Sequence, residues 1–172
     1  MKYEKLMRKE LIDLLEGGNA HFGFEEVLAD LPLEYVNKKP PNTPYSLWHF
    51  VEHLRIAQWD ILEFIRNPEH ESPEYPSGYR PDADETTDLA GWRQSCESFL
   101  TDLEALKDLV RDERRDLLAP LPHAKEYNLF REILLAADHN AYHIGELAIV
   151  RQVMGLWPAH NRYLTGSGSD LD

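Results

Sequence analysis

Apolar residues recur with the period of an α-helix in four segments of the chain, and no segment of useful length alternates as a β-strand does. Gly17 and Gly18 fall inside the first segment, but its apolar stripe stays in register across them. We therefore expect one helix there, with a kink or weak point at the glycines. That stripe consists of Tyr3, Leu6, Met7, Leu14, His21, Phe24, Leu28 and Leu31. The four predicted helices span residues 2–30, 46–66, 85–115 and 127–155.

Helices of this length predict an all-α fold, a four-helix bundle, in which the apolar stripes are buried against one another. The connection 68–84 is rich in proline and too broken for a regular element. It can nevertheless return along a helix of about 35 Å, because extended chain covers about 3.3 Å per residue. We therefore expect the second and third helices to be parallel, in an up-down-down-up bundle with a long crossover. An up-down-up-down bundle with one long decorative loop is the alternative.

Composition is that of a globular protein: 42% of the 172 residues are apolar, enough for a hydrophobic core. We expect a single bundle domain over residues 1–164 and a disordered tail over the small, polar residues 165–172. The chain holds 18 Lys and Arg against 31 Asp and Glu, a net charge of −13. This charge argues against partners that present phosphates, so we expect neither nucleic acid nor a membrane as a partner.

The cysteine content and the length of the apolar runs bear on location. A single cysteine, Cys96, excludes an intrachain disulfide and a cysteine-rich metal site. No apolar run approaches about 18 residues, and the first residues lead into no signal-peptide core. The predicted location is therefore cytoplasmic. Cys96 lies in the apolar stripe of the third helix, where a buried thiol has a raised pKa and low reactivity.

Two histidines of the fourth helix, His139 and His143, are four residues apart and share one helical face. That spacing lets two imidazoles bind one metal ion. The same face carries Ala136 and Leu147, which places the pair inside the bundle. Buried imidazoles need polar partners, so hydrogen bonds to neighbouring groups are the alternative to a metal.

A third histidine, His53, lies at the edge of the inner face of the second helix, about 14 Å from its start. If that helix begins at the bundle end where the fourth one finishes, His53, His139 and His143 meet at a similar depth. His21 would reach the same level, either lining a pocket or adding a ligand. Three neutral imidazoles and an open position form a catalytic type of site that suits Zn, Ni or Fe(II) better than Mg or Ca.

His49 and His53 are themselves four residues apart, so spacing alone does not choose between them. On the helical wheel His53 lies at the edge of the apolar arc and His49 about 40° further out, which favours His53 as the ligand. Two known patterns are excluded. The H-E-x-x-H helix of zinc peptidases needs glutamate where Asn140 stands, and no histidine follows a glutamate at the i+3 spacing of di-iron bundles.

Two of the predicted helices resemble helices of one family. The second contains PYSLWHFVEHL at 44–54 and AQWDIL at 57–62, and the fourth contains DHNAYHIGEL at 138–147, followed by Arg151. In this order they resemble the second and last bundle helices of DinB/YfiT-like proteins, and the resemblance covers nearly the whole chain. It implies an up-down-down-up bundle, often dimeric, with one divalent metal on three histidines. These match His53, His139 and His143.

Family members with assigned chemistry include transferases of low-molecular-weight thiols and metal-dependent hydrolases or isomerases. The resemblance thus implies a metal-dependent hydrolase or thiol S-transferase acting on a small molecule, with a thiol cofactor in the second case. The metal would lower the pKa of a bound water or thiol. Glu146, one turn beyond His143, is the candidate catalytic residue, as a hydrogen-bond acceptor behind the ligands or as a proton shuttle; an ordinary buried glutamate is the alternative.

The rival function is a non-catalytic bundle that binds metal or a ligand, or simply dimerises, with structural histidines. An open coordination position in an accessible pocket distinguishes catalysis from structure. Trp48 and Trp59 fall outside the inner arc of the second helix, which indicates a dimer face or cover by the proline-rich crossover. We expect the protein to form a homodimer. We expect His70 to lie on the surface of the chain.

Overall fold

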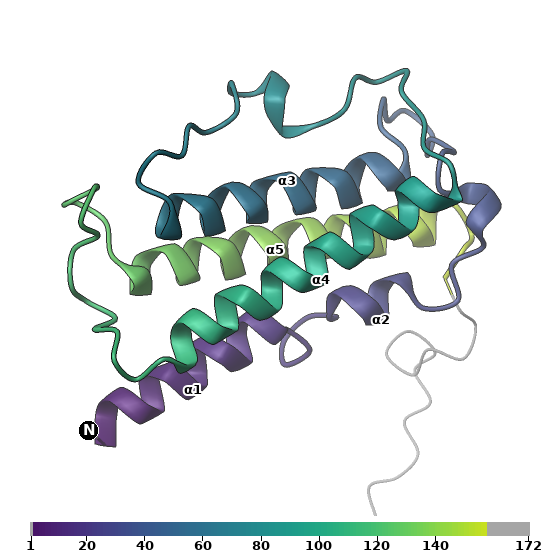
Figure 1. Ribbon diagram of the computed structural model, residues 1–172. Helices are drawn as coiled ribbons and strands as arrows, with labels where there is room; N and C mark the ends of the chain where they lie inside the picture. The colour runs from purple at the N-terminus through teal and green to yellow at the C-terminus, as the bar shows by residue number, and fades with distance from the viewer. Residues whose placement is uncertain (1, 158–172) are drawn as a thin grey trace, which may run out of the picture.

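The structure is all-helical over residues 2–157, the part of the chain that this computed structural model describes, and no β-strand forms among them. The predicted tail 165–172 lies outside the described residues, and the bundle domain 1–164 stays a prediction. Within 2–157, no helix combines the length and the apolar character needed to cross a membrane. The elements are α1 (Lys2–Glu16), α2 (Phe24–Leu28), η1 (Leu33–Tyr35), α3 (Leu47–Arg66), η2 (Ser77–Tyr79), α4 (Leu89–Arg111) and α5 (Leu129–Val153), where η marks a 3-10 turn (Figure 1).

The first predicted helix is two helices, so the expectation of one kinked helix over 2–30 is wrong. Gly17 and Gly18 adopt left-handed backbone conformations, with φ of +70° and +80°. Only glycine takes up this region without strain, and a left-handed residue ends an α-helix. A Cβ on Gly17 would also come within 2.9 Å of Cε1 of His21. The chain therefore leaves α1 at Glu16 and starts α2 only at Phe24, which makes five α-helices over 2–157 where four were expected.

The break also changes which residues of α1 face the core. Leu11 and Leu15 are buried, whereas Tyr3, Leu6 and Leu14 of the predicted stripe are exposed. One helical wheel cannot describe both α1 and α2, because residues 17–23 between them are not helical and the angular relation between the two helices is lost. The predicted core of the other helices is largely correct: the inner face of α3 is buried at Leu47, Phe50, Val51, Leu54, Ala57, Ile61 and Ile65.

Side-chain caps set the starts of the three long helices. Ser46 is the N-cap of α3, as expected. The carboxylate of Asp88 accepts a hydrogen bond from the Gly91 N–H at the start of α4, at 2.8 Å. The side-chain oxygen of Asn128 accepts one from the Arg131 N–H at the start of α5. The caps of α4 and α5 each satisfy a backbone donor that the first helical turn leaves without a partner.

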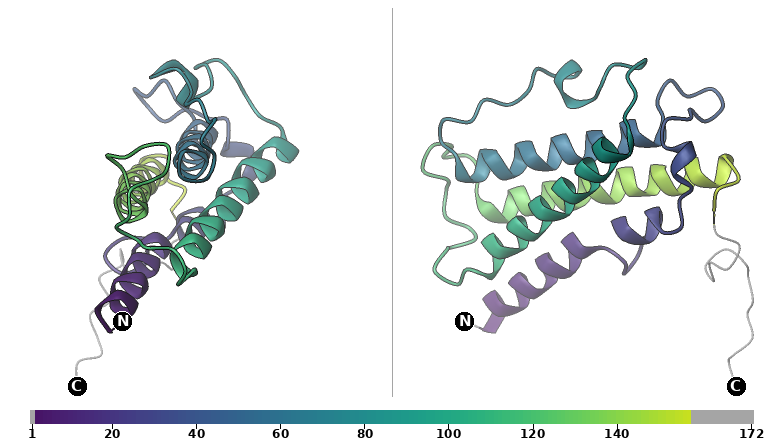
Figure 2. Two further views of the ribbon diagram at one scale, coloured as in Figure 1. Left: turned by 60° about the vertical axis from the view of Figure 1, so that its left-hand side comes forward. Right: turned by 45° about the vertical axis from the view of Figure 1, so that its right-hand side comes forward.

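Helix α3 lies at the centre of the arrangement, in contact with α4, α5 and η2, while α1 contacts α4 and α5. Figure 1 shows α3 and α4 running in one direction and α1 and α5 in the other. The crossover 67–88 returns along the outer side of α3, and both views of Figure 2 place it there. One face of α3 therefore packs on helices and another is covered by the crossover.

Hydrogen bonds attach the crossover to α3. Asp60 accepts from the hydroxyl of Tyr79 at 2.6 Å and bonds Nε2 of His70 at 2.7 Å. The ring of Trp59 meets that of His70 edge-on, so the crossover covers Trp59. The expectation that His70 lies on the surface is wrong, because only 6% of its side chain is exposed.

A buried arginine joins α5 to α2. The guanidinium of Arg151, fully buried, donates to the carbonyls of Val27 at 2.6 Å, Ala29 at 2.9 Å and Leu156 at 2.9 Å. These carbonyls belong to the last turn of α2 and to the turn after α5, where helical partners are missing. Arg151 therefore holds a five-residue helix that is too short to be stable alone.

Candidate metal centre

Three histidines from two helices converge between α3 and α5. His53 comes from α3, and His139 and His143 come from consecutive turns of α5. Nε2 of His53 lies 3.1 Å from Nε2 of His143 and 3.3 Å from Nε2 of His139. One nitrogen from each ring lies within 4.8 Å of the other two, so the three rings could hold one metal ion. The three predicted ligands are thus brought together.

The outer nitrogens of two of these rings are already engaged. Nδ1–H of His53 donates to the carbonyl of Tyr79 at 2.7 Å, and Nδ1–H of His143 donates to Glu146 at 2.7 Å. A neutral imidazole carries one proton, so Nε2 of each ring presents a lone pair. With both rings in that neutral form, the two lone pairs face each other at 3.1 Å. A cation at this point would replace a repulsive contact with two bonds.

Burial favours the neutral form of two of the three rings, His53 and His139. Burial, followed by the charges of His143 and His53, lowers the pKa of His139 to about 4. Burial also lowers the pKa of His53, with the charges of His143 and Arg80 acting in the same direction and the bond to Tyr79 opposing them. Neutral imidazole is the form that binds metals. At neutral pH His53 and His139 are therefore in the form that binds a metal ion.

The spacing of the nitrogens fits a small transition-metal ion. Nitrogens bound at about 2.0–2.1 Å in tetrahedral geometry lie about 3.3 Å apart, close to the two separations observed here. An all-imidazole set suits Zn, Ni or Fe(II), whereas Mg and Ca prefer oxygen. Nδ1 of His139 is buried and, unlike Nδ1 of His53 and of His143, accepts or donates no hydrogen bond of good geometry among residues 2–157.

The cluster forms part of the wall of a cavity of about 680 Å³. The cavity lies between α3, α5 and the crossover, and its volume suits a small-molecule site. Aromatic and apolar groups make up much of the wall, with Arg80 and Asp60 among the polar ones. The lining residues are Tyr45, His53, Ala57, Asp60, Ile61, Tyr75, Pro76, Ser77, Tyr79, Arg80, Pro81, Asp82, Ala83, Leu135, His139 and His143.

The other predicted site residues lie in two different places. Glu146 contacts His143, as a hydrogen-bond acceptor behind a ligand would. His21 lies in the linker between α1 and α2, where its Nδ1 bonds the carbonyl of Phe22 at 2.7 Å. It is not among the residues that line the cavity. The glycine break in the first predicted helix removes the depth argument that placed His21 beside the cluster.

His49 is buried and fully hydrogen-bonded. Its Nδ1 accepts from the backbone N–H and the hydroxyl of Ser46, and its Nε2–H donates to the carbonyl of Asp82 at 2.9 Å. Both ring nitrogens are therefore used within the protein. The wheel correctly separated His49 from the cluster, although it did not foresee that the crossover would cover this ring.

Sequence reasoning missed Tyr79 and Arg80 of the crossover and Asp60 of α3, which is the hydrogen-bond partner of Tyr79. Tyr79 contributes its carbonyl to His53 and its hydroxyl to Asp60. Burial and the bond to Asp60 raise the pKa of Tyr79 to about 12, so this hydroxyl stays protonated. No periodicity marks residues in such a loop. The one signal in the sequence was the pair of tyrosines and the single arginine in an acidic segment too long for a simple turn.

The lone cysteine does not belong to this centre. Cys96 is partly buried on α4 and is absent from the residues that line the cavity. Burial, with smaller contributions from Glu97 and Glu52, raises the pKa of its thiol to about 12. The thiol therefore stays protonated and weakly nucleophilic at neutral pH, as the sequence predicted.

The Glu146→Gln variant is expected to bind zinc about 10-fold more weakly than the wild type. The carboxylate accepts the Nδ1 proton of His143, and losing such a partner reduces the basicity and orientation of a ligand. Competition titration with a chromophoric chelator measures the affinity. Glu126→Gln, in the exposed loop before α5, is the control and should leave the affinity unchanged. Equal affinities for Glu146→Gln and the wild type would contradict this role.

Helices surrounding a cavity with three convergent histidines define a class of protein: a helical protein with a histidine group that could hold a metal ion at the wall of a pocket. Residues 23–147 match the family model of the DinB superfamily, and the chain belongs to this superfamily. The match spans His53, His139 and His143 and confirms the resemblance drawn from the two helices. No curated protein and no solved structure matches the chain significantly.

Proposed function

We propose that the protein is a metal-dependent enzyme that uses His53, His139 and His143 to hold one divalent ion, Zn, Ni or Fe. It activates water or a low-molecular-weight thiol against a small molecule, as a hydrolase or a thiol S-transferase does. The observation that carries this proposal is the position of the three Nε2 atoms in the wall of a cavity of about 680 Å³. A structural metal needs no such access, whereas a catalytic one does.

A metal ion bound there would lower the pKa of a water or thiol and so supply a nucleophile near neutral pH. The chain's own residues fix the ligands. The carbonyl of Tyr79 holds the proton of His53 at Nδ1, and Glu146 does the same for His143. With 36% of its side chain exposed, Glu146 is also able to exchange a proton with solvent, which supports its proposed role as a proton shuttle.

The proposal requires an open coordination position, which cobalt reports through its visible spectrum. We expect the spectrum of the protein loaded with one equivalent of Co(II) to change saturably on adding azide or 2-mercaptoethanol. His123→Ala, which alters an exposed loop histidine, is the control and should behave like the wild type. A spectrum that ignores both additives would indicate a closed site and favour the rival function, a non-catalytic bundle with structural histidines.

We also propose that the chain forms a homodimer in the cytoplasm. The dimer is supported by exposed apolar side chains on α5, with Tyr142 66%, Ile149 59% and Val153 59% exposed. The single free thiol is in keeping with a reducing compartment. We propose an up-down-down-up bundle in which α1 and α2 together form the first element, in keeping with the helix directions in Figure 1.

A further inference from the structure

One cation of the cavity wall has no polar partner. Arg80, on the crossover, is partly buried, and no described residue accepts a hydrogen bond from it or forms an ion pair with it. Its Nε is buried without a partner. Neither of the two carboxylates that line the cavity, Asp60 and Asp82, pairs with Arg80 among residues 2–157. A buried donor without an acceptor is costly, and a bound anion in this cavity would supply acceptors to the guanidinium of Arg80.

The guanidinium of Arg80 lies over two aromatic rings, and such contacts use none of its hydrogen-bond donors. Its central carbon lies 4.2 Å from the centre of the Tyr45 ring and 5.7 Å from that of Phe50. A guanidinium stacked on an aromatic ring uses its flat face, and its N–H groups remain in the plane around the edge. The fork of donors of Arg80 therefore remains available.

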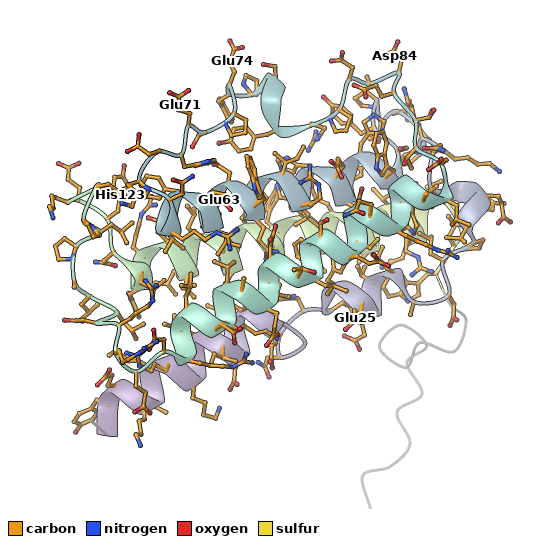
Figure 3. The ribbon with its side chains drawn as sticks, viewed as in Figure 1. Glu25, Glu63, Glu71, Glu74, Asp84 and His123 are labelled. Atoms are coloured by element: carbon orange, nitrogen blue, oxygen red, sulfur yellow. The ribbon has the colours of Figure 1, made fainter. Side chains whose placement is uncertain are left out.

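Besides the histidines, three charged side chains line the cavity, namely Asp60, Asp82 and Arg80, and Asp82 is exposed to solvent. Glu71, Glu74 and Asp84 of the crossover are exposed, and Figure 3 shows them on the outer side, directed away from the helices. Asp60 is already bonded to Tyr79 and His70. In a chain of net charge −13, the cavity thus combines an unpaired arginine with a cluster suited to a divalent cation.

We propose that Arg80 binds the carboxylate or similar anionic group of the substrate while the reacting group lies at the three histidines. This inference rests on the proposed function and names its substrate class: small organic anions. The fork of Arg80 matches a carboxylate in two parallel hydrogen bonds. The apolar body of the substrate lies against Tyr45, Ile61 and Leu135, which line the same cavity.

Matched charged and neutral thiols test the assignment in the Co(II)-loaded protein. The charged probes are mercaptoacetate and 3-mercaptopropionate, and the neutral ones of equal length are 2-mercaptoethanol and 3-mercaptopropanol. The sulfur-to-cobalt absorption reports binding of either kind. Of the two charged thiols, we expect the one that fits the cavity better to bind about 10-fold more tightly than the neutral thiol of equal length. A gain of this size in affinity is what one hydrogen-bonded ion pair contributes. Arg80→Gln should remove this preference and leave the neutral thiols unaffected.

Two further variants complete the design. Arg80→Lys keeps the charge and should retain part of the preference, and Arg93→Gln, which removes an exposed arginine on α4, should retain all of it. Unchanged binding of the neutral thiols shows that each variant is folded. Equal preference in the wild type and Arg80→Gln, or no preference in the wild type, would overturn the role of Arg80. Failure of every thiol to bind would instead overturn the proposed function.

Discussion

Replacing His139 by alanine is expected to abolish most of the stabilisation that zinc gives to the folded protein. A ligand that binds only the folded state adds about 2.7 kcal/mol at a hundredfold excess over Kd. His139 presents Nε2 to the cluster, and burial, which lowers its pKa to about 4, keeps the ring neutral at pH 7. Melting temperatures of the metal-stripped protein with and without zinc measure the effect.

His123 provides the matched control for this substitution. It is an exposed loop histidine whose Nε2–H donates to the carbonyl of Phe64, and it lies outside the lining of the cavity. His123→Ala should show the full rise in melting temperature. A similar rise in His139→Ala would mean that zinc binds elsewhere on the chain.

Replacing Arg151 by methionine is expected to lower the free energy of unfolding by about 3 kcal/mol or more. The guanidinium donates hydrogen bonds to the carbonyls of Val27, Ala29 and Leu156. Methionine has no donor, so these hydrogen bonds to buried acceptors would be lost. Because α2 depends on this contact, its packing against α5 should loosen as well. Urea unfolding followed by circular dichroism gives the free energy.

Arg114→Met serves as the reference for the Arg151 experiment. The side chain of Arg114 is 90% exposed and pairs with Asp112 at the surface. Such exposed pairs are screened by solvent and contribute little to stability. If both substitutions cost the same, the buried bonds of Arg151 are not what attaches α2.

The parts of the structure that the sequence predicted are those governed by local rules. Helices α3 and α5 follow from uninterrupted apolar periodicity, and His139 and His143 share a face because four residues make about one turn. The break after α1 was missed for the opposite reason. A stripe continuing in register does not reveal whether Gly17 and Gly18 are helical or left-handed, and the left-handed conformation ends the helix.

The crossover marks the limit of what the sequence could tell. Asp60, His70 and Tyr79 form one network although they lie in different segments, and their contacts depend on how the loop returns along α3. A helical wheel compares directions within one helix and does not represent a loop that covers it. The burial of His49 and the position of Arg80 in the cavity wall therefore emerge only from the three-dimensional arrangement.

The central claim is that three histidines bind one divalent ion, and a calorimetric zinc titration of metal-stripped protein, made without a histidine tag, tests it most directly. The claim predicts one zinc ion per chain in the wild type. It also predicts an affinity at least about 10-fold lower in His53→Ala, and little change in His49→Ala, whose ring nitrogens are used within the protein. No binding by the folded wild type, or equal affinities in wild type and His53→Ala, would contradict it.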